Sequence, residues 1–296
     1  MRFLNMLIND AIWLLDESLK KLPEVRQFDA DVADADAWLA RPARERSERE
    51  SANRQTERAL RNDLTLANVH VRMMGYTSRD IAAPFLLPEM VERVAAMLNY
   101  FLLFLAGPQR RQLKVKDPEK YGWNPKELLA MIADVYLNLF AADVDGAFIA
   151  AIAADGRSYR DEVFTETATV LRGLGLKSEH DVCRFEDLAE RTRLVHAAAE
   201  EEEADLGEIP DDFVDPIMCT LMTDPVLLPS GDTMDRANIM RHLLTDETNP
   251  FTRQPLKVAD LLPNTELKEK IDAWIAERKA LAAAGGGGAG AKKMES

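Results

Sequence analysis

Proline divides this chain into two parts that cannot fold in the same way. Half of its 14 prolines fall in one short stretch, at positions 210, 216, 225, 229, 250, 255 and 263. Because proline lacks a backbone N–H and breaks helix interiors, this stretch cannot form a long helix. Short β-prone pieces such as 225–228 alternate with a helical segment around 236–244, and another helix begins near 264. From residue 209 onward the sequence therefore predicts a small α+β domain.

Residues 1 to about 208 show one helical signal after another. Residue 88 places a proline in a first helical turn, and the apolar segment that follows ends at Gly107. Asn124 and Pro125 form a second start signal, with Asn124 as the cap. The first helix is predicted from a stripe at spacings of three and four, which we expect to face the core: Phe3, Leu4, Leu7, Ala11, Leu14, Leu15, Ser18 and Leu22. The fold class is therefore mainly α, followed by a small α+β domain.

Two segments depart from these patterns. Residues 28–60 are rich in charge and alanine and poor in large apolar residues, so we expect either an exposed helix or a partly ordered connection there. Residues 281–296 are of low complexity, and we expect them to be disordered.

Composition excludes several classes of partner. The formal net charge of -14 disfavours contact with phosphate backbones, so we expect no nucleic acid partner. The strongest apolar run, 94–106, contains Asn99 and is shorter than the roughly 20 residues that span a bilayer, so we expect no membrane partner. The N-terminal segment lacks the features of a signal peptide. Cys183 and Cys219 are too few for a disulfide framework, which indicates a reducing compartment, cytoplasmic and nuclear.

The second domain lacks the residues of a metal-stabilised finger. A two-zinc finger needs eight ligands at fixed spacing, and here Cys219 and His242 are the only typical ones. We therefore expect no metal and no cofactor, and loops held by hydrogen bonds and charge pairs instead. For any single candidate, a surface turn or cap is an equally good interpretation. The predicted polar network consists of Asp232, Thr233, Asp235, Arg236, His242, Asn249 and Thr252.

Residues 209–280 resemble the U-box family, a RING-like fold without zinc. The resemblance rests on IPDDFVDPIMCTLMTDPVLLPSG, MDRANIMRHLL, NPFTRQPL and LLPNTELKEKIDAWI, in the family's order. It implies a surface that holds a ubiquitin-loaded conjugating enzyme. In that family's pattern the first-loop contacts would be Ile217, Met218 and Cys219, and the second-loop contact Pro250. Arg253 would bridge the conjugating enzyme and ubiquitin, and so is the predicted catalytic residue, with core packing as the alternative role for Ile217.

Residues 1–208 resemble the core of ubiquitin conjugation factors of the chain-elongation class, which forms an armadillo-like helical scaffold before a U-box. The segments that carry this resemblance are FLNMLINDAIWLLDESLKKL, APFLLPEMVERVAAMLNYFLL, LKVKDPEKYGWNPKELL and FIAAIAADGRSY. Members of that family are longer, so the chain resembles their C-terminal portion. The predicted organisation is a helical core at 1–208, a U-box at 209–280 and a tail at 281–296.

The resemblances imply a ubiquitin-protein ligase that extends chains on substrates destined for the proteasome. The implied partners are a ubiquitin-conjugating enzyme, ubiquitin, ubiquitylated substrates and an AAA-type segregase of the valosin-containing protein family. One alternative is a non-catalytic scaffold in the same pathway. Another is a thiol enzyme that carries ubiquitin on Cys219, which would need an activating base such as His242.

Overall fold

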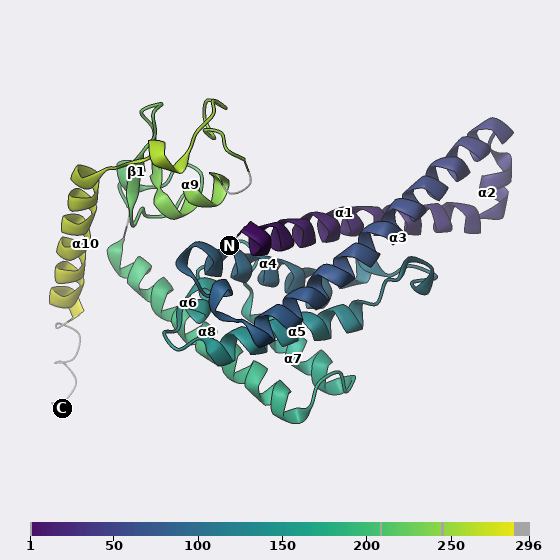
Figure 1. The fold of residues 1–296 in the computed structure, drawn as a ribbon, viewed down its shortest axis with the longest axis horizontal. Helices are drawn as coiled ribbons and strands as arrows, with labels where there is room; N and C mark the ends of the chain where they lie inside the picture. The colour runs from purple at the N-terminus through teal and green to yellow at the C-terminus, as the bar shows by residue number, and fades with distance from the viewer. Residues whose placement is uncertain (1, 208, 244–245, 287–296) are drawn as a thin grey trace, which may run out of the picture. The chain divides into compact units, whose positions relative to one another are not determined.

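The computed structural model describes residues 2–207, 209–243 and 246–286. The chain divides into two compact units, residues 1–196 and 197–296. Figure 1 shows that the first unit is entirely helical and that the second combines a small sheet with helices. The predicted fold class, mainly α followed by a small α+β domain, is confirmed.

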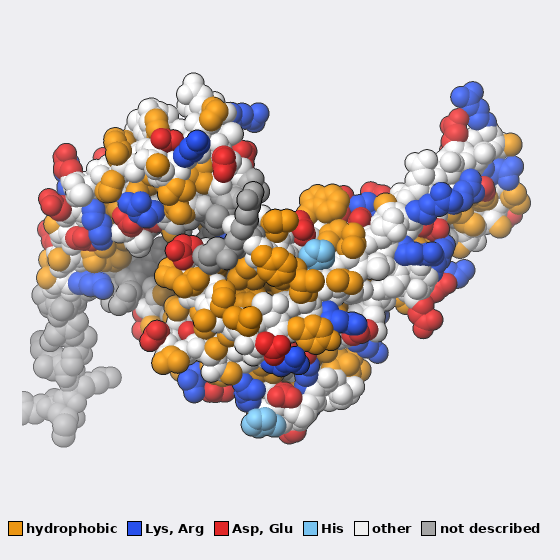
Figure 2. Space-filling model, in the orientation of Figure 1, with side chains coloured by type: hydrophobic (Ala, Val, Ile, Leu, Met, Phe, Trp, Pro, Cys, Tyr) orange, Lys and Arg blue, Asp and Glu red, His pale blue; other side chains and the backbone are white. Residues whose placement is uncertain are grey.

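The first unit begins with a long helical hairpin. Helices α1 (Arg2–Ala33) and α3 (Ala43–Asp80) lie side by side and are joined by the short helix α2 (Ala35–Ala40). Ion pairs of 3.0 Å from Lys21 to Asp63 and 2.7 Å from Arg49 to Asp31 join the two long helices. Around α2, side chains of both charges mix on the surface (Figure 2). Of the two predictions for residues 28–60, the exposed helix is therefore correct.

The predicted stripe on α1 is buried except at its first member. Its other residues, from Leu4 to Leu22, are buried, and the hydroxyl of Ser18 donates to the carbonyl of Leu14 at 2.7 Å. The side chain of Phe3, by contrast, is 61% exposed, so its predicted place in the core is wrong. Phe3 lies on the solvent-facing side of the helix, as do Met6 and Trp13, which are also exposed.

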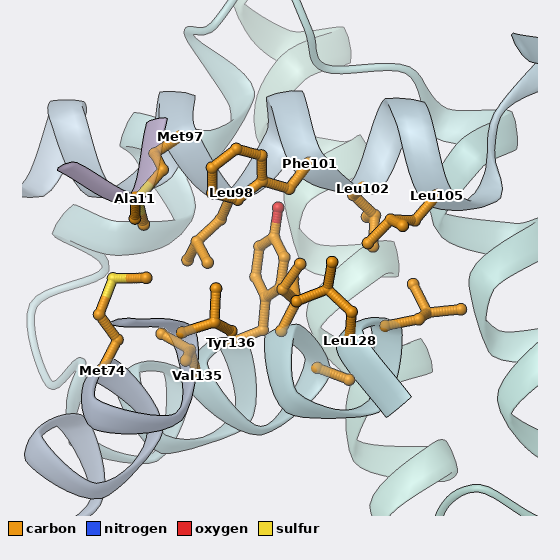
Figure 3. Close-up of a cluster of buried hydrophobic side chains, with 14 of the residues drawn as sticks. Ala11, Met74, Met97, Leu98, Phe101, Leu102, Leu105, Leu128, Val135 and Tyr136 are labelled. Carbon is orange, nitrogen blue, oxygen red and sulfur yellow. The ribbon is translucent and has the colours of Figure 1, made fainter. Parts of the chain in front are cut away.

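Helix α4 (Pro88–Ala106) lies at the centre of the first unit because it is apolar nearly all round. It packs against α5 (Pro125–Ala142), α6 (Ala147–Ala153) and α7 (Asp161–Gly173), and α8 (Glu179–Leu206) follows. Figure 3 shows Tyr136 of α5 among the apolar side chains of α4. Its hydroxyl donates to the buried amide oxygen of Asn99 at 2.7 Å. Three short 3-10 helices complete the described part of the unit: η1 (Ala83–Phe85), η2 (Pro108–Leu113) and η3 (Glu119–Tyr121).

The local start signals operate as predicted. The side chain of Asn124 accepts a hydrogen bond from the N–H of Glu127, and Pro125 is the first residue of α5. Pro88 likewise begins α4, which ends before Gly107. In the part of the chain that the structure describes, no helix has the length and apolar content needed to cross a bilayer.

The second unit has a three-stranded antiparallel sheet in the order β2-β1-β3. Its strands are β1 (Pro225–Leu227), β2 (Thr233–Asp235) and β3 (Leu262–Pro263), with Val226 opposite Met234 and Leu227 opposite Leu262. The helices are η4 (Asp211–Phe213), α9 (Arg236–Leu243), η5 (Val258–Asp260) and α10 (Thr265–Gly286). The core consists of Val226, Leu228, Met234, Ile239, Leu243, Leu256 and Leu261.

The structure describes only the first part of the tail predicted to be disordered, residues 281–286 of 281–296. Helix α10 continues to Gly286, so residues 281–286 are helical. Residues 287–296, the rest of the predicted tail, lie outside the described residues.

Candidate functional site

Two surface loops of the second unit share one backbone construction. The first loop is residues 215–220 and the second loop is residues 249–254, 34 positions further on. Each begins with Asp or Asn followed by proline. The Oδ1 atom of this first residue accepts hydrogen bonds from the N–H groups two and three residues later. The distances are 3.0 and 2.9 Å in the first loop and 2.8 and 3.1 Å in the second. Such side-chain turns fix a tight bend without a metal.

The backbone bonds of the two loops match as well. In both, the carbonyl of the first residue accepts the N–H four residues on at 2.8 Å, and its N–H donates to the carbonyl five residues on at 2.8 Å. An isolated β-bridge closes each loop, Val214 with Leu221 and Thr248 with Pro255. The second unit therefore presents the same rigid turn twice.

Both loops hold a non-glycine residue in the left-handed backbone region at their fifth position. Cys219 has φ 55° and Arg253 has φ 60°. For an L-residue this region costs roughly 1 to 2 kcal/mol, so the surrounding hydrogen bonds must impose it. Strain of this kind is concentrated at functional sites in proteins.

The third position of each loop carries an exposed apolar side chain. Ile217 is 44% exposed and its counterpart Phe251 is 41% exposed. Core packing of Ile217, the alternative raised by the sequence, is therefore wrong. Exposed apolar side chains on rigid turns are typical anchors of a protein interface. Pro250 and Met218 are half-buried beside them, whereas Cys219 and Arg253 are exposed.

Phe251 was not predicted from the sequence. The signal that could have found it is the repeated pattern of Asp or Asn, then proline, at residues 215–216 and 249–250. Aligning the two turns places Phe251 at the position of Ile217.

Asp215 holds the first loop through hydrogen bonds that both of its carboxylate oxygens accept. Its side chain is fully buried. Oδ1 accepts the loop N–H groups of Ile217 and Met218, while Oδ2 accepts the N–H of Asp235 at 2.8 Å and the amide of Asn238 at 3.0 Å. Burial opposes the charge, but these four donors favour the carboxylate and hold the pKa of Asp215 below its ordinary value.

Asp235 is the second buried carboxylate of the network. Its Oδ2 accepts the N–H and hydroxyl of Thr223 and the N–H of Asp224, and its Oδ1 accepts the N–H of Ala237 at 3.0 Å. It thus ties the turn before β1 to the start of α9. Asp235 was among the predicted network residues, whereas Asp215, Thr223 and Asn238 were not.

Asn249 holds the second loop in the same way that Asp215 holds the first. It is 3% exposed, and its amide nitrogen donates to the hydroxyl of Ser230 at 2.8 Å. That hydroxyl donates to Asp232 at 2.7 Å. At the base of the loop, Nε2 of His242 lies 2.8 Å from the carbonyl oxygen of Thr248.

The remaining predicted network residues make more peripheral bonds. The hydroxyl of Thr233 accepts from the amide of Asn264 at 3.3 Å, and that of Thr252 accepts the N–H of Gln254 at 3.5 Å. Arg236 forms a 2.6 Å ion pair with Asp224, but the two side chains are 36% and 55% exposed. Solvent therefore weakens that pair, unlike the buried bonds of Asp215 and Asp235.

The arrangement suits docking better than covalent chemistry. Among the described residues, no group of three or more His, Cys, Asp or Glu side chains could hold a metal ion. One ring nitrogen of His242, Nε2, is engaged by the carbonyl of Thr248, so that nitrogen is not available as an activating base. A surface hollow of about 360 Å³ lies beside the second loop, lined by His242, Asp246, Thr248, Asn249, Pro250 and Arg253.

Comparison with known proteins gives two family matches. Residues 1–193 match the ubiquitin elongating factor core, and residues 209–280 match the U-box domain. The second match contains both loops and the whole polar network.

Curated relatives match along nearly the whole chain. The "Probable ubiquitin conjugation factor E4" of Arabidopsis thaliana is 49% identical over 276 residues, which cover 93% of this chain and 26% of that protein. "Ubiquitin conjugation factor E4 A" of Pongo abelii is 40% identical over 94% of this chain and 26% of its own length. "E4 ubiquitin-protein ligase UFD2" of Saccharomyces cerevisiae is 39% identical over 94% of this chain and 29% of its own length.

The chain thus spans between a quarter and a third of the length of these relatives. The core match covers more than half of the chain and is followed directly by the domain that carries the two loops. On this evidence the chain belongs to the ubiquitin elongating factor family, with a core region followed by a U-box.

Proposed function

We propose that this chain acts as a U-box ubiquitin-protein ligase that extends ubiquitin chains on substrates. In this role it binds a ubiquitin-conjugating enzyme and positions its ubiquitin thioester for attack, without carrying ubiquitin itself. The observation that carries the proposal is the pair of matching loops, which present Ile217 and Phe251 as apolar anchors and Arg253 in a constrained backbone.

The two kinds of loop residue suggest a division of labour. Ile217 and Phe251 are apolar and suit a contact with the conjugating enzyme alone. The guanidinium of Arg253 offers several donors in a planar fork, which suits simultaneous contact with carbonyl groups of the enzyme and of ubiquitin. Contacts made mainly in the reactive, closed state accelerate the reaction rather than merely tighten binding.

Two substitutions separate these roles. Ile217→Ala should weaken binding of the uncharged conjugating enzyme by roughly 1 to 3 kcal/mol, and thioester discharge should fall with it. Arg253→Ala should slow discharge much more than it weakens binding. The measurements are the affinity for the uncharged enzyme and the single-turnover discharge of its ubiquitin thioester onto free lysine. Ser51→Ala, at an exposed position of α3, is the control.

The outcomes discriminate between functions. If Arg253→Ala lowered affinity and discharge equally, Arg253 would be an ordinary docking residue. If the wild-type chain bound the enzyme but never accelerated discharge, the non-catalytic scaffold would be the correct function. A thioester-linked ubiquitin on wild-type protein that disappears in Cys219→Ser would instead support the covalent mechanism.

The wider partners form part of the same proposal. We infer that ubiquitylated substrates, and a segregase ATPase of the valosin-containing protein family, bind the protein in the cytoplasm and nucleus. Binding assays with purified ATPase, and with substrates carrying one ubiquitin, test this independently of discharge. Chain growth on a pre-ubiquitylated substrate that depends on this protein would support elongation, and its absence with every conjugating enzyme in a panel would oppose it.

A further inference from the structure

Ser230 connects the β1–β2 turn to the second loop. It lies in the turn between the two strands, where Gly231 adopts φ 91° and its N–H donates to the carbonyl of Leu228 at 2.9 Å. The Ser230 hydroxyl meets two side chains, the amide of Asn249 at 2.8 Å and the carboxylate of Asp232 at 2.7 Å. A residue of an exposed turn thus reaches a side chain that is almost fully buried.

The chemistry of Asn249 fixes the direction of this contact. Its amide oxygen must accept from the N–H groups of Phe251 and Thr252, so its NH₂ group must face Ser230. The serine oxygen therefore accepts, and its proton goes to Asp232. The hydrogen bonds thus connect the carboxylate of Asp232, the hydroxyl of Ser230, the side-chain amide of Asn249 and the N–H groups of the second loop, and the donor in each bond is fixed.

The β1–β2 hairpin also contacts the first loop, at its other end. The N–H of Asp235, at the end of β2, donates to the buried carboxylate of Asp215. One hairpin therefore bonds to Asp215 of the first loop and to Asn249 of the second. The two loops are thereby linked to each other through the hairpin.

We propose that Ser230 is a positioning residue for Arg253. Asn249 holds Arg253 directly, because its carbonyl accepts the Arg253 N–H at 2.8 Å. Ser230 holds Asn249 through its amide, and thereby sets the second loop in register with the first. Uncharged conjugating enzyme can bind through the apolar anchors alone, whereas discharge needs Arg253 in its place at the same time. This inference rests on the proposed function.

The test compares Ser230→Ala, which removes the hydroxyl, with Ser230→Thr, which keeps it. In the alanine variant we expect discharge to slow about fivefold, the rate equivalent of one lost hydrogen bond. Affinity for the uncharged conjugating enzyme should fall by about twofold, less than discharge, because the Ile217 anchor on the first loop keeps its place and only Phe251 moves with the second loop. The threonine variant should restore most of the discharge rate, and Ser51→Ala should match wild type in both assays.

Hydrogen exchange supplies a readout that does not depend on ligase activity. In Ser230→Ala, the amides of Phe251, Thr252 and Arg253 should exchange faster, while Ile217 and Met218 keep their protection. Unchanged exchange across 251–253 would overturn the proposal, as would equal loss of affinity and discharge. If wild-type protein did not accelerate discharge at all, the ligase function would fail, and exchange alone would decide whether Ser230 holds the loop.

Discussion

Replacing Asp215 by alanine should destabilise the U-box measurably. The side chain is fully buried and accepts four hydrogen bonds. After truncation, the N–H groups of Ile217 and Met218 lie on a surface loop and can bond to water. The N–H of Asp235 is buried and loses its acceptor, whereas the side-chain amide of Asn238 is only half-buried and can bond to water.

The expected loss follows from the one buried donor, the N–H of Asp235. Leaving a buried donor unsatisfied costs about 1 to 3 kcal/mol. A domain of the length matched here, residues 209–280, has a total stability of about 4 to 11 kcal/mol at typical values per residue. The substitution should therefore remove about a quarter of the stability, and the U-box should remain largely folded.

Hydrogen exchange of the full chain separates this effect from the helical unit. The free energy of opening, read from the slowest amides of β1, β2 and α9, should fall by the amount above, while that of α4 and α5 should not change. Asp211→Ala, an exposed acidic residue shortly before the first loop, is the matched control and should change it by less than about 0.5 kcal/mol. A loss below about 1 kcal/mol for Asp215→Ala would refute the reasoning, because water would then replace the carboxylate freely.

Further outcomes follow from other contacts of the same unit. Arg236→Ala should lower the free energy of unfolding by at most about 1 kcal/mol, because its ion pair with Asp224 is largely exposed. Urea titration measures this loss, and a variant that is already unfolded without urea would contradict the prediction. The pKa of Asp215 in the folded protein lies below its ordinary value of 3.8. The carboxylate therefore contributes its full stabilisation above pH 3.8, and this contribution is lost as the pH falls through the folded-state pKa. In Asp215→Asn, the free energy of unfolding should show no such loss in an acid titration. Arg253→Gly should leave stability unchanged or raise it by up to about 1 kcal/mol, since glycine accepts φ 60° without strain, yet thioester discharge should slow. Dialysis against a chelator should leave hydrogen exchange in the U-box unchanged, and a stoichiometric metal found by elemental analysis would contradict this.

The helices could be predicted from the sequence because their signals are local. Asn124 caps α5 through the N–H three residues on, and Pro88 begins α4 at a position where its missing N–H costs nothing. Phe3 was assigned to the core wrongly because spacing alone cannot tell which edge of a stripe meets a neighbour. A stripe predicts a buried face, but its width depends on the packing of other helices.

The site was less predictable because its bonds join distant residues. Asp215 bonds to Asp235 and Asn238, about 20 positions away, and nothing in the sequence specifies that pairing. The sequence did suggest that polar side chains replace metal, and Asp235 and Asn249 prove to be buried and multiply bonded. It could not rank them against Arg236, since burial decides the strength of each interaction.

The matching turns have a consequence for how this docking surface can change. Each turn takes its shape from its first residue, Asp215 or Asn249, and from backbone hydrogen bonds, so the third and fifth side chains contribute little to the shape. Those outward side chains are Ile217 and Cys219 in one turn, and Phe251 and Arg253 in the other. Under the proposed function, substitutions at these four positions would therefore change the contacts with a conjugating enzyme while the backbone of each turn stays the same.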